Sequence, residues 1–218
     1  MSRIAYNQDL MKLRAAIMQM GQAVAERMAK TMDALARGDK VVATEIAGSD
    51  KEIDEMERHI ERMCMSIITH QQPVARDLRV ITACLKMVTD IERIADQCAD
   101  ISEIIAGDHL GNNAELISHI LKMGEKALTM IKDALDAFDR LDTKLAREVC
   151  MADDEVDALF SKIILEVCRA IGQNSQDPMS DVDLMFITKY VERIADHATN
   201  IAEWVIYVKT SELPALKD

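Results

Sequence analysis

Residues that interrupt helices are scarce in this sequence. Its 218 residues include only three prolines and seven glycines, whereas Ala, Leu, Met, Glu, Lys and Arg are abundant. Proline and glycine mark most turns, and the abundant residues favour helix. The composition therefore argues against a fold with many tight turns and predicts an all-α protein.

The chain also lacks a long apolar run. No segment approaches the ~18 consecutive apolar residues that span a bilayer, and the first residues, MSRIAYNQDLMKL, contain no apolar signal segment. We therefore expect a cytoplasmic protein, which could still lie peripherally at the inner membrane through its partners.

The sequence also argues against a nucleic-acid-binding protein and against disulfide-bonded or zinc-binding cysteines. The formal net charge is −12 and no run of Lys and Arg forms a basic stripe, which argues against nucleic acid as a partner. The five cysteines are an odd number and show no CxxC spacing. Because most of them occupy apolar positions of helical patterns, we interpret them as reduced core thiols, without disulfide or zinc roles.

The sequence contains an internal duplication. DIERIADQCADISE (90–103) and YVERIADHATNIAE (190–203) share the run ERIAD at an offset of 100. Upstream, Met20-Gly21 matches Met123-Gly124, and DKEID (50–54) matches DDEVD (153–157), both at an offset of 103. A duplicated unit constrains architecture more firmly than local propensity does. We therefore predict two copies of one structural unit.

Each copy divides into three predicted helices. In the first copy, apolar side chains between Leu10 and Leu35 advance mostly in steps of three and four, which lines one helix face. Pro73 stops the second helix because proline cannot continue the hydrogen-bond ladder. In the first copy, the first helix is predicted to end near residue 38, and the other two to cover about 50–71 and 75–105. In the second copy, the three helices are predicted to cover about 114–138, 143–171 and 182–208.

Short connections make neighbouring helices antiparallel, so each copy should form an up-down-up three-helix bundle. Residues 107–113 join the copies and are too few for a flexible tether. We therefore expect two domains, residues 1–109 and 110–218, that pack against each other around a pseudo-twofold axis.

Pairs of acidic residues four apart recur in both copies. Such residues project from one side of a helix, where like charges cost about 0.2–0.5 kcal/mol per pair. A cation or a basic neighbour must offset that cost. The pairs are Asp50 with Asp54, Glu92 with Asp96, Asp153 with Asp157, and Glu192 with Asp196.

The helix register brings these pairs toward each other. Pro73 lies 23 residues after Asp50 and 23 before Asp96. Antiparallel helices that turn at Pro73 therefore place Asp50 level with Asp96, and Asp54 opposite Glu92. In the second copy, a turn near residue 176 places Asp153 and Asp157 within roughly one helical turn of Asp196 and Glu192. An all-oxygen cluster suits Mg, Ca, Mn or Fe and disfavours structural zinc. We therefore predict a four-carboxylate metal site in each bundle.

Three other interpretations stay open. The acids could form a solvated face paired by Arg93, Arg193, Lys51 and Lys189, and duplication could have copied them passively. A carboxylate-bridged metalloenzyme is the second alternative. Against it, the third residue after the Glu of each ERIAD run is Ala, not His, and no nucleophile or base is evident. The third is a structural helical dimer without metal.

Several motifs resemble the PhoU family of phosphate uptake regulators. They are MGQAV (20–24), DKEIDEMER (50–58), QQPVARDLRVI (71–81), TDIERIAD (89–96) and YVERIADHATNIAEWVIY (190–207). The resemblance covers nearly the whole chain, from Leu10 to about Val208. Two departures stand out: alanine replaces the family's usual glycine at positions 95 and 195, and the first copy has DQCADI where the family has a DHAxNI pattern.

The resemblance implies two three-helix bundles in one chain and a homodimer. It also implies multinuclear metal clusters of Fe, Mn, Mg or Zn, held by E(D)xxxD motifs that fall on the eight carboxylates above. The implied function is that of a non-enzymatic adaptor that signals ample phosphate. Its implied partners are a phosphate-sensing membrane histidine kinase and the ATPase subunit of the phosphate ABC transporter, both of which it restrains.

Overall fold

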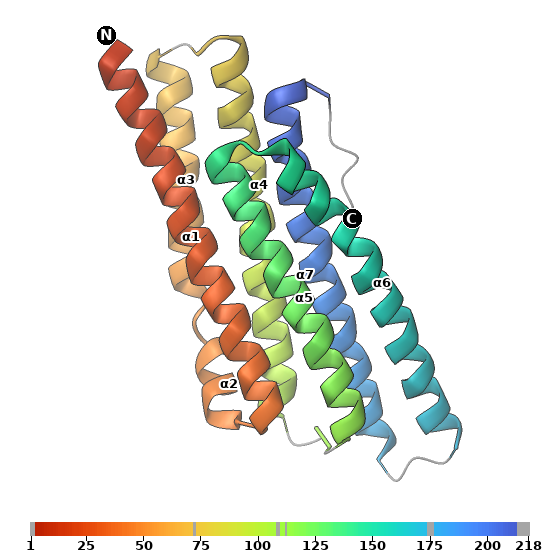
Figure 1. The fold of residues 1–218 in the computed structure, drawn as a ribbon. Coiled ribbons are helices and arrows are strands. Elements are labelled where there is room, and N and C mark those ends of the chain that lie inside the picture. Colours follow the sequence, from red (N-terminus) through yellow and green to blue (C-terminus); the bar gives the residue numbers. More distant parts are fainter. Residues whose placement is uncertain (1–2, 72, 108–109, 112, 174–176, 213–218) are drawn as a thin grey trace.

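The computed structural model describes residues 3–71, 73–107, 110–111, 113–173 and 177–212. Every regular element in this part of the chain is a helix, which confirms the all-α prediction (Figure 1). The helices are α1 (Arg3–Arg37), α2 (Lys40–Ala47), α3 (Asp50–Gln71), α4 (Ala75–Ala106), α5 (Ala114–Arg140), α6 (Thr143–Gly172) and α7 (Pro178–Thr210).

The structure differs from the sequence prediction in an additional short helix, α2, and in an earlier start of α7. The sequence pattern predicts no helix between residues 38 and 50, yet α2 forms there, and the Asp39 side chain caps it by accepting hydrogen bonds from the backbone N–H groups of Val41 and Val42. The helix α7 begins at Pro178, about one turn before the predicted start. The Asp177 side chain caps this end, and proline is well tolerated in the first turn of a helix.

The two copies have equivalent helices: α1 matches α5, α4 matches α7, and α2 with α3 matches α6. The offset of 103 maps the residues of α2 onto 143–150, the first residues of α6. The helix α6 is therefore continuous at the position where the first copy breaks at Gly48 and Ser49.

The two bundles pack directly against each other. The helix α4 lies along α7, and α1 lies along α5; within each of these pairs the chains run in opposite directions (Figure 1). One hydrophobic cluster contains buried side chains from both bundles. These contacts confirm the predicted pseudo-twofold arrangement. The predicted domain boundary between residues 109 and 110 touches the undescribed residues 108–109.

Two glycines allow α1 and α5 to approach closely. A Cβ atom on Gly21 would overlap the side chain of Leu135, and one on Gly124 would overlap Met32. Met32 and Leu135 are equivalent at the same offset of 103 as the two glycines. The duplicated Met-Gly motif therefore marks the crossing of the two bundles.

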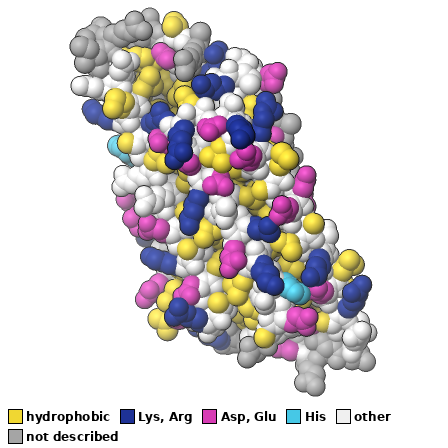
Figure 2. Space-filling model, in the orientation of Figure 1, with side chains coloured by type: hydrophobic (Ala, Val, Ile, Leu, Met, Phe, Trp, Pro, Cys, Tyr) yellow, Lys and Arg dark blue, Asp and Glu magenta, His cyan; other side chains and the backbone are white. Residues whose placement is uncertain are grey.

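The surface contains both charge signs. On the face shown in Figure 2, acidic and basic side chains alternate with apolar ones. Within the residues that the structure describes, no helix combines the length and apolar character needed to cross a membrane. All five cysteines are free; Cys64, Cys84 and Cys98 are buried as predicted, Cys150 is half-buried, and Cys168 is exposed.

Candidate metal-binding clusters

The eight predicted ligands lie on two helix hairpins, α3–α4 and α6–α7. The first cluster is Asp50, Asp54, Glu92 and Asp96, and the second cluster is Asp153, Asp157, Glu192 and Asp196. The acids lie at half-buried or buried positions of these helices: Asp153 and Asp196 are buried, and the other six are half-buried.

Glu92 is the most enclosed acid of the first cluster, with a side chain that is 16% exposed. Its pKa is raised to about 7, first by burial and then by the charges of Asp96, Glu57 and Asp54, against the opposing effect of Arg93. Asp54 and Glu57 come from α3, whereas Asp96 comes from α4. The two helices therefore bring their acids close enough to interact.

Glu57 also belongs to this group, although the four-residue spacing of the acidic pairs does not include it. Burial raises the pKa of Glu57, with further contributions from Glu61, Asp54 and Asp96. Glu57 lies three residues after Asp54, so it occupies the same helix face. The spacing of three residues from Asp54 could have pointed to Glu57. Acidic residues at this spacing are too common in acidic helices, however, to identify a site residue.

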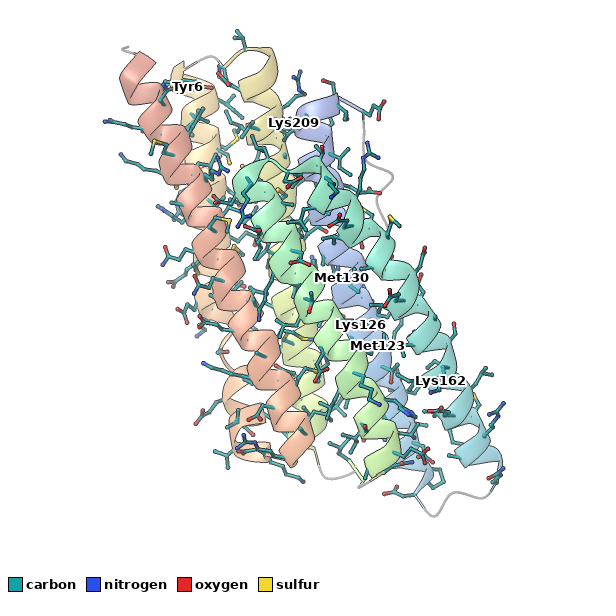
Figure 3. All side chains as sticks on the ribbon, in the orientation of Figure 1. Tyr6, Met123, Lys126, Met130, Lys162 and Lys209 are labelled. Atoms are coloured by element: carbon teal, nitrogen blue, oxygen red, sulfur yellow. The ribbon has the colours of Figure 1, made fainter. Side chains whose placement is uncertain are left out.

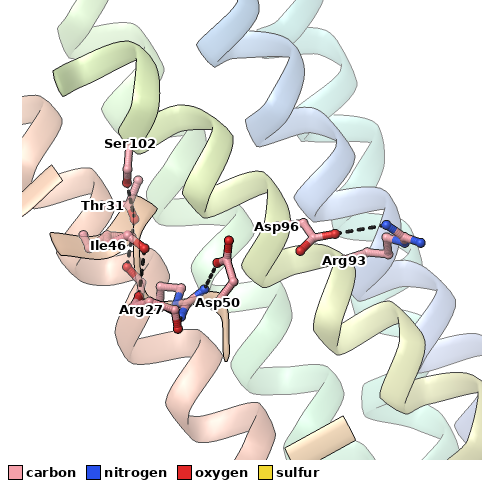
Figure 4. A network of polar contacts seen from close by, with 8 residues as sticks. Arg27, Thr31, Ile46, Asp50, Arg93, Asp96 and Ser102 are labelled. Carbon is pink, nitrogen blue, oxygen red and sulfur yellow. Dashed lines mark hydrogen bonds and ion pairs between the residues drawn. The ribbon is translucent and has the colours of Figure 1, made fainter. Parts of the chain in front are cut away.

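Arginines hold the acids of the first cluster in this structure. Arg93 lies between two of them, with Nε 3.5 Å from Oε2 of Glu92 and Nη1 donating to Oδ2 of Asp96 at 3.0 Å. Arg58 and Arg27 hold the other two: Nη2 of Arg58 donates to Oδ2 of Asp54 at 3.3 Å, and Nη1 of Arg27 donates to Oδ1 of Asp50 at 2.8 Å. Part of this network is drawn in Figure 4. The pairing of acids by basic residues, left open as an alternative, is thus present here.

The second cluster is more deeply buried. Asp153 and Asp196 are buried, and Asp157 and Glu192 are half-buried. Lys189 forms an ion pair with Glu192.

Glu203 also lies near the second cluster. The pKa of Cys150 is raised to about 11, first by burial and then by the charges of Glu203 and Asp153. Glu203 of α7 and Asp153 of α6 therefore approach the same thiol.

The acids of the two clusters are not arranged as a metal coordination sphere in this structure. Among the described residues, no group of three or more His, Cys, Asp and Glu side chains is arranged so that it could hold one ion. The donor chemistry nevertheless fits hard divalent cations, since all predicted ligands are carboxylates. The pKa of Glu92 is raised mainly by burial, and the charges of Asp96, Glu57 and Asp54 add to that effect against Arg93. Metal binding therefore stays a prediction.

A polar contact joins the two bundles near the clusters. Oδ1 of Asp90 on α4 lies 2.9 Å from Nδ1 of His197 and accepts a hydrogen bond from Nδ2 of Asn200 at 3.1 Å, both on α7. The counterpart of Asp90 in the second copy is Tyr190, so the contact breaks the symmetry of the duplication. This asymmetry in sequence was the only signal of the contact.

Comparisons with known proteins agree with the fold and the duplication. A family model described as the PhoU domain matches residues 17–105 and 120–205. The phosphate-specific transport system accessory protein PhoU homolog of Clostridium acetobutylicum is 35% identical over the full length of both chains. That of Zymomonas mobilis is also 35% identical, over 95% of this chain and 88% of the relative.

Solved structures show the same arrangement. The crystal structure of PhoU from Pseudomonas aeruginosa superposes with a TM-score of 0.87 at 31% identity, over 95% of this chain and 100% of that one. The phosphate transport system regulatory protein PhoU from Streptococcus pneumoniae superposes with a TM-score of 0.90 at 27% identity, over 97% and 100%. Since the family model covers most of the chain in two copies, the chain belongs to the PhoU family.

Proposed function

We propose that this chain is a non-enzymatic regulator of phosphate uptake and of the phosphate-starvation response. It acts in the cytoplasm, as a homodimer, and restrains the ATPase subunit of the phosphate ABC transporter and a phosphate-sensing membrane histidine kinase. The names of its relatives, accessory proteins of the phosphate-specific transport system, support the transport role. The kinase role rests on the family resemblance.

Divalent metal ions, of Fe, Mn, Mg or Zn, bind the two clusters in this proposal and tune the regulator. The observation that supports this part is that acids of both helices, Asp54 and Glu57 of α3 and Asp96 of α4, act on the buried Glu92 and help to raise its pKa. A bound ion would stabilise the folded chain, because the unfolded chain does not hold these acids together.

Chelation tests the metal part. Purified protein is divided, one half is stripped with a chelator, and metal content is measured by elemental analysis before and after. We expect the melting temperature to fall on stripping and to recover with added metal, because stabilisation by a ligand scales as RT ln(1 + [L]/Kd). An unchanged melting temperature after verified stripping would contradict the metal part alone.

Co-purification tests the partner part. The tagged chain is recovered from native membranes grown with and without phosphate, and the transporter ATPase and the histidine kinase are identified by mass spectrometry. We expect to recover both the ATPase and the kinase at high phosphate. We expect smaller amounts of both proteins with a variant in which all eight cluster carboxylates are changed to amides. The matched control changes eight exposed acids outside the clusters to amides: Glu26, Glu45, Glu55, Glu115, Glu125, Glu148, Asp154 and Glu212.

Recovery of neither partner under any condition would contradict the regulatory role. Equal losses in the cluster variant and the control would assign the effect to net charge and remove the clusters from partner binding.

A further inference from the structure

A pocket between α1 and α3 has more basic than acidic side chains in its lining. Its volume is about 370 Å³, within the range of roughly 300–1,000 Å³ that is usual for small-molecule sites. On α3 its polar residues advance in steps of three and four, so they share one helix face. The polar residues of the lining are Asp9 and Lys12 of α1 and His59, Arg62 and Ser66 of α3.

The permanent cations of this pocket are not held by neighbouring acids. Lys12, His59 and Arg62 take part in none of the ion pairs formed among the described residues. Lys12 and Arg62 carry two positive charges and Asp9 carries one negative charge, which leaves an excess of one. In a chain with a formal net charge of −12, this pocket is a local region of positive charge.

The equivalent position of the second copy is occupied by a carboxylate of the protein itself. At the offset of 103, Glu166 corresponds to Met63, which also lines the pocket, and Lys162 corresponds to His59. Oε1 of Glu166 lies 3.7 Å from Nζ of Lys162 (Figure 3), and Oε2 lies 2.7 Å from Nδ1 of His119 on α5. The second copy thus provides its bases with an internal anion.

The first copy has bases but lacks this carboxylate. Met63 has an uncharged thioether, Lys12 replaces Glu115, and Arg62 replaces Leu165. These three differences make the first-copy pocket more positive. They outweigh the opposite changes at positions 9, 59 and 66, where the second copy has Asn, Lys and Arg. An anion from solution therefore fits where the second copy uses its own.

The side chains of the pocket suit a phosphate dianion. Guanidinium and ammonium groups bind phosphate oxygens through charge-assisted hydrogen bonds, and the hydroxyl of Ser66 adds a neutral donor. Asp9 favours phosphate over sulfate, because monohydrogen phosphate carries a P–OH proton that a carboxylate accepts, and sulfate carries none. A phosphodiester has no such proton either, so the headgroup of a phospholipid such as phosphatidylglycerol fits less well.

We propose that the pocket between α1 and α3 binds a phosphate group, as inorganic phosphate or as a small phosphate monoester. Lys12 and Arg62 neutralise its charge, His59 and Ser66 donate hydrogen bonds to its oxygens, and Asp9 accepts from its P–OH group. This inference goes beyond the proposed function and depends neither on the metal clusters nor on the partners.

Equilibrium dialysis with radiolabelled inorganic phosphate tests this on the full-length chain, after removal of metal with a chelator. We expect saturable binding of one phosphate per chain. The double variant Lys12→Gln/Arg62→Gln should raise the Kd at least about tenfold. The matched control, Lys132→Gln/Arg147→Gln, removes the same charge from exposed positions outside the pocket and should leave the Kd within about twofold.

A single substitution gives the first copy the carboxylate of the second. Met63→Glu should abolish phosphate binding, because the new carboxylate competes for the same cations. Met63→Gln has the same shape without the charge and should bind phosphate as the unmodified chain does. Melting temperatures of both variants show whether they fold. If neither folds, the two double variants still decide whether the cations of the pocket bind phosphate.

Competing ligands test the chemical class. Phosphate should bind at least about tenfold more tightly than sulfate, and Asp9→Asn should reduce this difference. Displacement of labelled phosphate by a lower concentration of glycerol 3-phosphate than of unlabelled phosphate would assign the pocket to monoesters, and the reverse order would assign it to inorganic phosphate. Vesicles of phosphatidylglycerol and phosphatidylcholine should not sediment the chain through Lys12 and Arg62.

Three results would overturn the inference. They are no saturable binding of either phosphate or glycerol 3-phosphate, equal weakening by the pocket variant and its control, and affinity for sulfate equal to that for phosphate. Vesicle binding that is lost in Lys12→Gln/Arg62→Gln, without binding of free phosphate, would assign the pocket to a lipid surface and would overturn it as well. None of these results bears on the metal or partner parts of the proposed function, since neither metal nor partner is present in the assay.

Discussion

At the scale of single residues, Glu92 couples the stability of the chain to pH. Its pKa in the folded chain is about 7, above the ordinary value of 4.5, because it is buried among like charges. Between these two values the folded chain holds a proton that the unfolded chain releases. The stability contributed by this group is therefore complete below pH 4.5 and is lost as the pH rises toward 7.

The variant Glu92→Gln should remove that loss. In metal-free protein at pH 8, we expect its free energy of unfolding to exceed that of the unmodified chain by about 1–3 kcal/mol, since each pKa unit corresponds to about 1.4 kcal/mol. Near pH 4.5 the two should be nearly equal. Urea unfolding at both pH values measures the difference.

The equivalent residue of the second copy is the control. Glu192 forms an ion pair with Lys189, so Glu192→Gln loses a favourable contact worth about 0–1 kcal/mol. We expect no gain in stability at pH 8 for this variant. Equal gains for both variants would show that general charge reduction, not the surroundings of Glu92, controls the effect.

At the scale of helices, the crossing of α1 and α5 depends on glycine. Gly21→Ala should gain roughly 1 kcal/mol of helix propensity. The added methyl would overlap Leu135, however, and overpacking of a core costs typically about 1–3 kcal/mol. We expect a net loss of about 1 kcal/mol, measured by thermal or urea unfolding.

Gly172→Ala is the matched control, because nothing lies within 4 Å of the added atom at the end of α6. This variant should be as stable as the unmodified chain or slightly more stable. If Gly21→Ala behaves in the same way, the close approach of α1 and α5 described here is wrong.

The contact between α4 and α7 is also open to measurement. Asp90→Ala leaves the donors of His197 and Asn200 without their acceptor at a mostly buried interface, which should cost about 1–3 kcal/mol. A double-mutant cycle with His197→Ala should show a coupling of at least about 0.5 kcal/mol. Simple additivity of the two substitutions would mean that this contact does not join the bundles energetically.

At the scale of the whole molecule, the shared core predicts cooperative unfolding. Side chains of both bundles belong to one hydrophobic cluster, so neither bundle can unfold without exposing the apolar face of the other. The only tryptophan, Trp204, lies on α7, so its fluorescence reports on the second bundle, whereas circular dichroism reports on both. We expect the two signals to give one midpoint.

A substitution in the first bundle sharpens this test. Ile17 on α1 is fully buried, and Ile17→Ala should destabilise the chain by about 2–5 kcal/mol. The midpoint seen by Trp204 fluorescence should fall as far as that seen by circular dichroism. Separate midpoints would show that the bundles unfold independently.

Much of this molecule could be predicted from its sequence because the signals are local or directly repeated. The apolar period and the few prolines and glycines located six of the helices within a few residues. The repeated ERIAD run revealed two copies, and the distances from Pro73 predict Asp54 opposite Glu92, whose pKa the charge of Asp54 helps to raise. The short α2 was missed although its Asp39 cap was visible, because eight residues between two breakers show too little periodicity.

Only the tertiary structure decided which charges meet. The partner of Asp50 is Arg27, and the partner of His197 is Asp90, which lies in the other bundle. Such pairings depend on how each helix is rotated about its axis, and that rotation is set by packing over the whole core. The sequence alone therefore determined the helices, the duplication and the acids, whereas the fold determined which basic side chains meet those acids, because only packing sets how the helices are rotated.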